Sequence, residues 1–361
     1  MKLTNTTPNH DGFRMVAEFE PQQSSYLIWP ERQDNWRNGG KPVQKVFTEL
    51  AKTIAKFQPV TMLVNQDQYI NAKDKLDGIA RVVEMSSDDA WAKDTLPIYV
   101  KKQNKIRAVD FSFNAWGGVL DGLFFPWDKD NMLGAKIADL NEIDYYSSDI
   151  ILDGCAILTD GDGTILTTED VLLAEDRNPN VTRSFMENVL KEYLGAKKVI
   201  LLKHGYLLDE TGGDIDNIVN FLGPANLVLT WTDNREDPLY EVCREAYDIL
   251  SHSTDALGRK FKITKMPIPS IQKLTKEETE GLDLVKGLMP RSIGQRLTAT
   301  YVSFITLNNA IIYPTFDDPQ DEIAEKTFKS LFPNKQIIGF PVREILIGGG
   351  GLHAIINNLP Y

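Results

Sequence analysis

The stretch KPVQKVFTELAKTIAKFQPVTMLV, residues 41–64, places an amphipathic helix directly before a buried strand. Apolar side chains recur at the helical period through 41–57, and the compact apolar run at 59–64 is typical of a strand. The same alternation continues along the whole chain and indicates a mixed α/β fold. Further strands are expected at 81–85, 97–101, 106–111, 197–203, 226–231, 299–307, 309–313 and 335–339.

Two later helices have recognisable start signals. Asp237-Pro238 and Asp318-Pro319 each combine an N-cap residue with proline at the first helical position. A third helix is expected over 182–194. Residues 268–296 are polar and rich in turn formers, and we expect a long loop there.

A doubly wound parallel sheet is the first architecture that such alternation suggests. Several strands, however, are followed by another strand after a few residues, which a pure βαβ succession does not do. The sequence also lacks a G-x-G-x-x-G or Walker A loop between an early strand and a helix. Its glycines gather instead at 348–351, so the doubly wound architecture is disfavoured.

The charge balance narrows the class of ligand. Acidic residues outnumber basic ones by 51 to 39, and the net charge of −12 disfavours a nucleic-acid or anionic-membrane surface. It suits a small cation. Two cysteines are too few for a disulfide framework or a cysteine zinc site. The first residues contain no apolar signal region and no run reaches 18 apolar residues, so a cytoplasmic location is expected.

Five segments combine carboxylates or glycine turns with indoles and small residues. Carboxylates match a guanidinium two donors at a time, and indole faces attract cations. Together the segments predict a pocket for a planar cation. They are SSDDAWAKDTLP (86–97), FNAWGGVLDGLFFPWDKD (113–130), ILDGCAI (151–157), DETGGDIDN (209–217) and GGGGLHAIINNLP (348–360).

From DGFRMVAEFEPQQSSYLIWPERQDNWRNGGKPVQK (11–45) through FNAWGG and PWDKD to the glycine-rich end, the chain resembles the agmatine deiminases of the guanidino-group-modifying superfamily. The resemblance covers essentially the whole sequence. It implies one domain over residues 1–361, a five-fold pseudosymmetric α/β propeller (the pentein fold) built from ββαβ-type units around a central pocket. The family reaction converts agmatine and water into N-carbamoylputrescine and ammonia, a step of putrescine biosynthesis.

The resemblance also implies roles for individual residues. In the family a cysteine thiolate attacks the guanidinium carbon, two carboxylates hold its nitrogens, and a histidine with a neighbouring carboxylate transfers protons. Asp94 and Asp153 stand at the positions of the holding carboxylates, Asp153 in place of a glutamate, and Asp216 keeps the carboxylate beside the histidine position. The residues expected to line the substrate pocket with them are Trp91, Trp116, Gly117 and Gly118.

Both reactive positions depart from the family pattern. The family's GGGNIHCITQQ reads GGGGLHAIINN here, which puts Ala354 at the nucleophile position, and its N-G-H-V-D reads GGDID, which puts Asp214 at the histidine position. A methyl group cannot form the covalent intermediate, and an aspartate is not expected to deliver a proton as an imidazolium does. Losing a nucleophile or its base costs a serine protease on the order of 10⁶ in turnover. Little or no family hydrolysis is therefore predicted.

Two neighbouring residues could be mistaken for replacements. Cys155 stands where the family has glycine, and we expect a buried, unreactive thiol rather than a substitute nucleophile. His353 precedes Ala354 and is expected to point away from the pocket.

Four aspartates, at positions 94, 153, 214 and 216, would then converge with no compensating histidine, and crowded carboxyl groups have raised pKa values unless a cation joins them. A polyamine or a divalent metal could neutralise them, but the Asp214-x-Asp216 spacing is a weak metal signal, and no metal or cofactor is predicted.

The expected partner is a small guanidino or polyamine cation, with no nucleic acid and no membrane. The resemblance also implies a homo-oligomer, dimer or tetramer, or a hetero-oligomer with an active paralogue. Two alternatives stay open: a binding or regulatory protein that senses agmatine or polyamines, and a hydrolase that works by a different, metal-assisted route.

Overall fold

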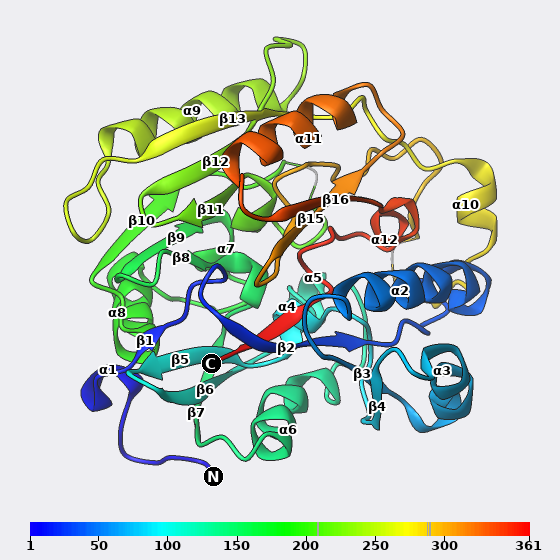
Figure 1. Ribbon diagram of the computed structural model, residues 1–361, viewed down its shortest axis with the longest axis horizontal. Coiled ribbons are helices and arrows are strands. Elements are labelled where there is room, and N and C mark those ends of the chain that lie inside the picture. Colours follow the sequence, from blue (N-terminus) through cyan, green and yellow to red (C-terminus); the bar gives the residue numbers. More distant parts are fainter. Residues whose placement is uncertain (208, 287, 289) are drawn as a thin grey trace.

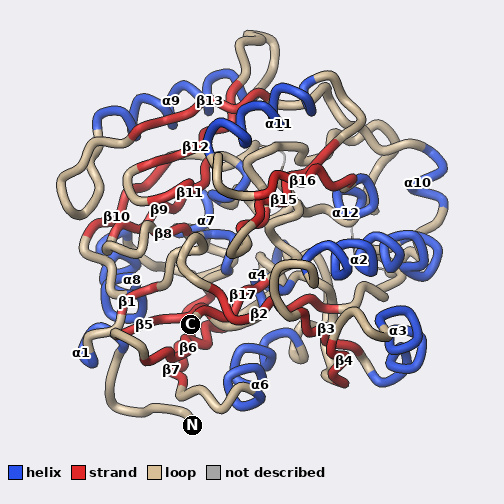
Figure 2. The backbone as a smooth tube through the Cα atoms, in the orientation of Figure 1, coloured by secondary structure: helices blue, strands red, loops and turns tan. Residues whose placement is uncertain are grey.

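The strands of the computed structural model form several small sheets rather than one large one. The structure describes residues 1–361 except 208, 287 and 289. Across these residues the strands make five sheets of three or four strands, and none of the five is closed. Figures 1 and 2 show the strands mostly in the interior and the longer helices toward the outside. The mixed α/β class is confirmed.

Each sheet follows one order: two antiparallel strands, a helix, and a strand parallel to the second. The first contains β17 (Asn357–Pro360), β2 (Gln22–Ile28), α2 (Lys41–Ile54) and β3 (Val60–Val64), extended by α3 (Tyr69–Leu76) and β4 (Arg81–Glu84). The second contains β5 (Ile98–Lys102), β6 (Lys105–Ser112), α6 (Leu133–Leu140) and β7 (Tyr145–Ile151), with β1 (Arg14–Met15) beside β5.

The other three sheets repeat the pattern more simply. The third contains β8 (Leu158–Thr159), β9 (Thr164–Thr168), α7 (Glu169–Leu172), α8 (Arg183–Leu194) and β10 (Lys198–Leu202). The fourth contains β11 (Val219–Gly223), β12 (Asn226–Trp231), α9 (Leu239–His252) and β13 (Lys262–Pro267). The fifth contains β14 (Ile305–Thr306), β15 (Ala310–Thr315), α11 (Gln320–Leu331) and β16 (Gln336–Pro341). This is the expected ββαβ order, while the five-fold propeller arrangement and the single domain stay predictions.

Short helices fill the connections between these units. They are α1 (Pro8–Asp11), α4 (Ala92–Thr95), α5 (Gly118–Asp121), α10 (Lys276–Glu280) and α12 (Arg343–Ile347). The expected loop at 268–296 is wrong at α10, where Thr275 and Glu278 form a capping box that begins the helix. The expected strand at 299–307 is also wrong for its first part, because only Ile305–Thr306 pairs in a sheet. Residues 301–304 are buried there without joining a sheet, so burial rather than strand pairing explains their apolar character.

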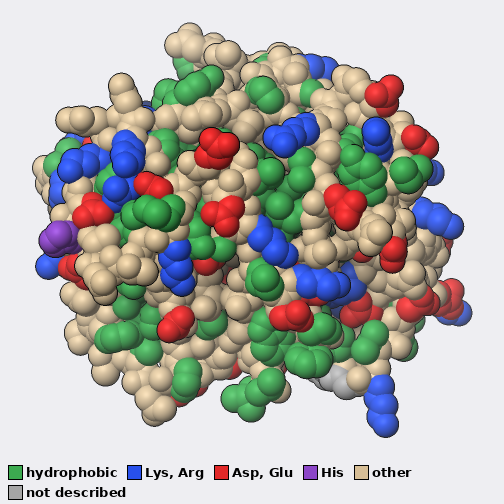
Figure 3. Space-filling model, turned by 90° about the horizontal axis from the view of Figure 1, so that it is seen from below, with side chains coloured by type: hydrophobic (Ala, Val, Ile, Leu, Met, Phe, Trp, Pro, Cys, Tyr) green, Lys and Arg blue, Asp and Glu red, His purple; other side chains and the backbone are tan. Residues whose placement is uncertain are grey.

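Burial of apolar side chains explains why the helices lie against the sheets. In α2 the residues Val43, Phe47, Leu50 and Ile54 form one buried stripe within the largest hydrophobic cluster. The outer surface is different, since Figure 3 shows acidic and basic side chains interspersed with apolar ones on one face. Among the described residues, no helix has the length and apolar character needed to cross a membrane.

Candidate active site

Equivalent turns of different sheets meet at one pocket. The helix α4 precedes β5, the 3-10 turn η4 (Gly154–Ala156) precedes β8, η5 (Ile215–Asn217) precedes β11, and residues 348–354 precede β17. All four turns contribute to the wall of a pocket of about 370 Å³. Four of the five sheets thus contribute the turn before a strand to one pocket, and side chains far apart in sequence converge there.

The pocket confirms the convergence of the five segments. Each of them supplies wall residues, and two further regions that the sequence did not single out complete the wall. From the five segments come Trp91, Asp94, Trp116, Leu120, Asp121, Gly122, Leu123, Cys155, Asp209, Glu210, Thr211, Asp214, Asp216, Asn217, Gly348, Gly349, Gly350, Gly351 and Ala354. From elsewhere come Arg32, Asp34, Asn35, Leu284, Val285, Leu288, Pro290, Arg291 and Gln295.

Glycines allow the final turn to approach the indoles. A Cβ atom on Gly350 would overlap the ring of Trp91, and one on Gly351 would overlap the side chain of Ser303. Trp91 in turn lies edge-on to Trp116, with ring centroids 6.3 Å apart. Two indoles therefore form an aromatic part of the wall, as predicted for Trp91 and Trp116.

The two predicted glycines support the wall without being part of it. A Cβ atom on Gly117 would lie 2.5 Å from the backbone of Asp121, and Gly118 has a left-handed φ of +59°. These glycines shape the tight turn at α5 that carries Leu120 and Leu123 to the pocket. The expectation that Gly117 and Gly118 contact a ligand is not met by their positions.

Asp94 is held at the pocket by the neighbouring turn η4. Its Oδ1 accepts a hydrogen bond from the backbone N–H of Cys155 at 2.9 Å. Burial, followed by the charge of Asp153, raises the pKa of Asp94 to about 8. The ionised form of Asp94 is therefore disfavoured at this place in the pocket.

Asp153 differs from its predicted role because it already has a guanidinium partner. Arg177 donates from Nε to Oδ2 of Asp153 at 2.7 Å and from Nη2 to the carbonyl oxygen of Thr211 at 2.6 Å. Asp153 is buried but is not among the pocket-wall residues. The aspartate therefore lies behind the wall, engaged by the protein's own arginine. The sequence reasoning missed Arg177.

Asp214 lies in a crowded acidic part of the pocket. Its Oδ2 accepts a hydrogen bond from the Thr211 hydroxyl at 2.6 Å, and its Oδ1 lies 3.8 Å from Nη2 of Arg177. Burial and the adjacent Asp209 raise the pKa of Asp214 well above its usual range, while burial and Asp216 raise that of Asp209 to about 6. Crowding and burial therefore disfavour the ionised form of Asp214.

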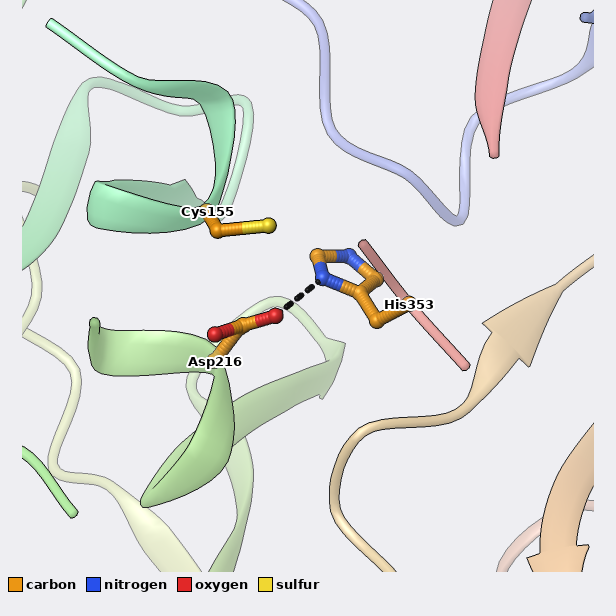
Figure 4. A group of neighbouring side chains, drawn as sticks. All are labelled: Cys155, Asp216 and His353. Carbon is orange, nitrogen blue, oxygen red and sulfur yellow. Dashed lines mark hydrogen bonds and ion pairs between the residues drawn. The ribbon is translucent and has the colours of Figure 1, made fainter. Parts of the chain in front are cut away.

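His353 corrects the expectation of an uncompensated acidic cluster. Its Nδ1 lies 2.8 Å from Oδ2 of Asp216 (Figure 4). Its Nε2 lies 2.7 and 2.9 Å from the carboxylate oxygens of Glu18. Burial lowers the pKa of this imidazole, but the charge of Glu18 and the hydrogen bonds to Asp216 and Glu18 together raise it to about 9. His353 is not among the pocket-wall residues, but its ring points toward Asp216 and Cys155, which are. Glu18 lies more than 300 residues away in sequence, so no local pattern could have revealed this contact.

The position predicted for the nucleophile carries only a methyl group. Ala354 lines the pocket, and its carbonyl oxygen accepts the backbone N–H of Lys93 at 3.0 Å. Cys155 also reaches the wall but is 2% exposed, and burial and the charge of Asp216 raise the pKa of its thiol well above the usual range. The expectation of a buried Cys155 is confirmed.

Comparison with known proteins places this geometry in a family. Residues 14–360 match the model of the Porphyromonas-type peptidyl-arginine deiminases. The chain belongs to this family. Its agmatine deiminase relatives are close in sequence. A Listeria monocytogenes protein provisionally named agmatine deiminase 2 is 52% identical, over 98% of this chain and 96% of its own.

Two further relatives of the family extend the match. The agmatine deiminase of Pseudomonas aeruginosa strain LESB58 is 45% identical, over all of this chain and 99% of its own. A solved agmatine deiminase of Enterococcus faecalis, studied catalysing its reaction, superimposes with a TM-score of 0.96 at 40% identity, covering 99% of each chain. The predicted family is thus shown over nearly the whole chain.

Within this family the pocket offers carboxyl groups and indoles, but no thiol at position 354. The described residues also include one buried group of metal-binding character, which consists of Cys155, Asp216 and His353.

Proposed function

We propose that this chain is a cation-binding member of the agmatine deiminase family, which binds agmatine or a related polyamine and performs little or no cysteine-dependent hydrolysis. The observation that carries the proposal is Ala354 on the wall of a carboxylate-rich pocket. A methyl group cannot add to a guanidinium carbon. The pocket retains its acidic and aromatic surfaces while its nucleophile position is inert.

Charge and shape support binding. Asp94, Asp214 and Asp216 line the pocket together with the two indoles of Trp91 and Trp116. A planar cation gains hydrogen bonds from carboxylates and favourable contact with aromatic faces. The space of about 370 Å³ lies within the range of small-molecule sites.

Cys155 is a poor replacement for the missing nucleophile. The thiolate is the reactive form of cysteine, and burial among carboxylates raises the pKa of the Cys155 thiol well above its usual range, which disfavours a free thiolate. Its backbone N–H is also tied to Asp94, which fixes the turn that carries it. We therefore expect no covalent adduct between Cys155 and agmatine.

Calorimetry and an ammonia-release assay on one preparation test the proposal. We expect agmatine to bind with one site per chain and putrescine to bind more weakly, because it lacks the planar guanidinium. No ammonia should be released above the host background. Brisk ammonia release, or the absence of any agmatine binding, would overturn the proposal.

A reconstruction tests whether the missing groups explain the missing activity. The triple variant Ala354→Cys, Asp214→His, Asp153→Glu restores the family residues, and we expect it to gain measurable ammonia release. The matched control combines Asp214→His and Asp153→Glu with Ala354→Ser, a weaker nucleophile at the same position, and should release far less. Equal rates in the triple variant and the serine control would contradict a thiol mechanism in this scaffold.

A further inference from the structure

Three buried side chains from three distant segments form a group that the proposed function does not use. Cys155 comes from η4, Asp216 from η5 and His353 from the turn before β17, and Figure 4 shows them pointing toward one another. One ligand atom from each lies within 4.8 Å of the others. We propose that Cys155, Asp216 and His353 bind a divalent transition metal ion, with Zn²⁺ the best-suited ion.

The donor set fits that class of metal. A thiolate, an imidazole and a carboxylate are all zinc ligands, and sites with three protein ligands leave one position for water or another small ligand. Tetrahedral zinc with bonds of about 2.0–2.3 Å places its ligand atoms about 3.3–3.8 Å apart. The ligand atoms now lie up to 4.8 Å apart, and side-chain rotations that move them by roughly 1 Å would bring them to that tetrahedral spacing.

Glu18 supplies the outer partner that metal-bound histidines use. Its carboxylate oxygens lie 2.7 and 2.9 Å from Nε2 of His353, so Nε2 can donate its proton to Glu18. Nδ1 now lies 2.8 Å from Oδ2 of Asp216, and metal binding would exchange the proton between these two atoms for the metal ion. A carboxylate that accepts from the second imidazole nitrogen fixes the tautomer and the ring orientation of a ligating histidine.

An unsatisfied oxygen gives independent support for a missing ligand. The side chain of Asp216 is only 2% exposed, and its Oδ1 accepts no hydrogen bond from the described residues. Oδ1 of Asn217 in the same turn also accepts no hydrogen bond from the described residues. Buried acceptors without donors are costly, and a bound cation would satisfy them.

The local charge also tolerates a dication. Asp94, Asp214 and Asp216 are buried near this group, and Asp209 is half-buried beside them. The facing cations already have carboxylate partners, since Lys93 pairs with Glu18 and Arg177 pairs with Asp153 and Asp214. A metal ion would add positive charge where these carboxyl groups are crowded. Because Cys155 and Asp216 also line the pocket, the open coordination position would face it.

Metal loading of chelator-treated protein tests the site without an activity measurement. We expect one Zn²⁺ per chain by elemental analysis, and Co²⁺ in its place should give a near-ultraviolet absorption band from sulfur-to-cobalt charge transfer. Cys155→Ser should abolish that band and weaken Zn²⁺ binding at least tenfold. Cys243→Ser is the matched control, because Cys243 is equally buried but lies in α9 within another hydrophobic cluster, and it should keep the band.

Two further variants separate a metal site from general damage. Asp216→Asn should weaken Zn²⁺ binding, and Glu18→Gln should weaken it less, because Glu18 acts through His353. Circular dichroism of each metal-free variant establishes that it is folded. Wild-type protein that takes up no Zn²⁺ or Co²⁺, or a Cys155→Ser variant that keeps the cobalt band, would overturn the proposal. Agmatine binding is measured separately, so failure of one proposal leaves the other standing.

Discussion

We expect Asp94 to couple cation binding to proton release, because its pKa is raised to about 8 by burial and by Asp153. A bound guanidinium favours the ionised carboxylate, so the affinity for agmatine should rise between pH 6 and pH 8, by up to about tenfold per pH unit. Asp94→Asn should weaken binding and reduce this slope. Calorimetry at three pH values in two buffers measures both, with the exposed Asp67→Asn as control. An unchanged slope in Asp94→Asn would show that other groups carry the coupling.

The raised pKa of Asp94 also makes the free energy of unfolding depend on pH. This free energy should fall with rising pH, whereas the affinity for agmatine should rise. A carboxyl group whose folded pKa exceeds its unfolded pKa stabilises the fold at low pH, and that contribution is lost as the pH rises through about 8. His353, with its pKa raised to about 9, acts in the same direction. Asp94→Asn should therefore gain stability relative to wild type between pH 5 and pH 9, by at most about 1.4 kcal/mol per pH unit. Urea denaturation at pH 5, 7 and 9 measures the difference, and a constant difference would argue against a buried protonated Asp94.

At the scale of elements, Arg291 joins the segment 268–296 to three walls of the pocket. Its guanidinium donates to Glu210 at 2.7 Å, to Oδ1 of Asn35 at 2.7 Å and to the carbonyl oxygen of Gly348 at 2.7 Å. Arg291→Ala should weaken agmatine binding several-fold and speed proteolysis within this segment, with little change in global stability. Arg291→Lys should rescue only partly, because an ammonium lacks the planar fork. The exposed Lys286→Ala on the same segment should behave like wild type in a timed proteolysis assay.

The elements also show what the sequence could and could not predict. Periodicity located α2 and β3, and the Asp-Pro pairs located α9 and α11 to within a residue or two. The capping box at Thr275 and Glu278 follows a T-x-x-E pattern and was readable in principle. Arg177 was not, because nothing local shows that its partner is Asp153. For the same reason the sequence analysis predicted Asp153 on the pocket wall. The structure shows Asp153 behind the wall, hydrogen-bonded to Arg177.

At the scale of the whole molecule, the two ends of the chain meet in one sheet. β17, near the last residue, pairs antiparallel with β2, near the first, and places Leu359 opposite Ser24. The sequence pattern alone could not have given this pairing, because hydrophobic periodicity describes a segment and not its distant partner. The turn that ends in Ala354 runs directly into β17, so the position of this part of the pocket wall depends on the pairing of the chain ends.

A core substitution in β17 tests that dependence. Leu359 is 6% exposed and packs in the largest hydrophobic cluster, so Leu359→Ala should cost about 2–5 kcal/mol in the free energy of unfolding. Tyr361→Ala, two residues on and 59% exposed, should cost well under 1 kcal/mol and serves as the control. If β17 supports the pocket, the folded fraction of Leu359→Ala should also bind agmatine less tightly than Tyr361→Ala does. If Leu359→Ala loses stability but binds agmatine with unchanged affinity, the pocket wall does not depend on full packing of β17. The backbone hydrogen bond from Lys93 to the carbonyl oxygen of Ala354 would then be enough to hold this part of the wall.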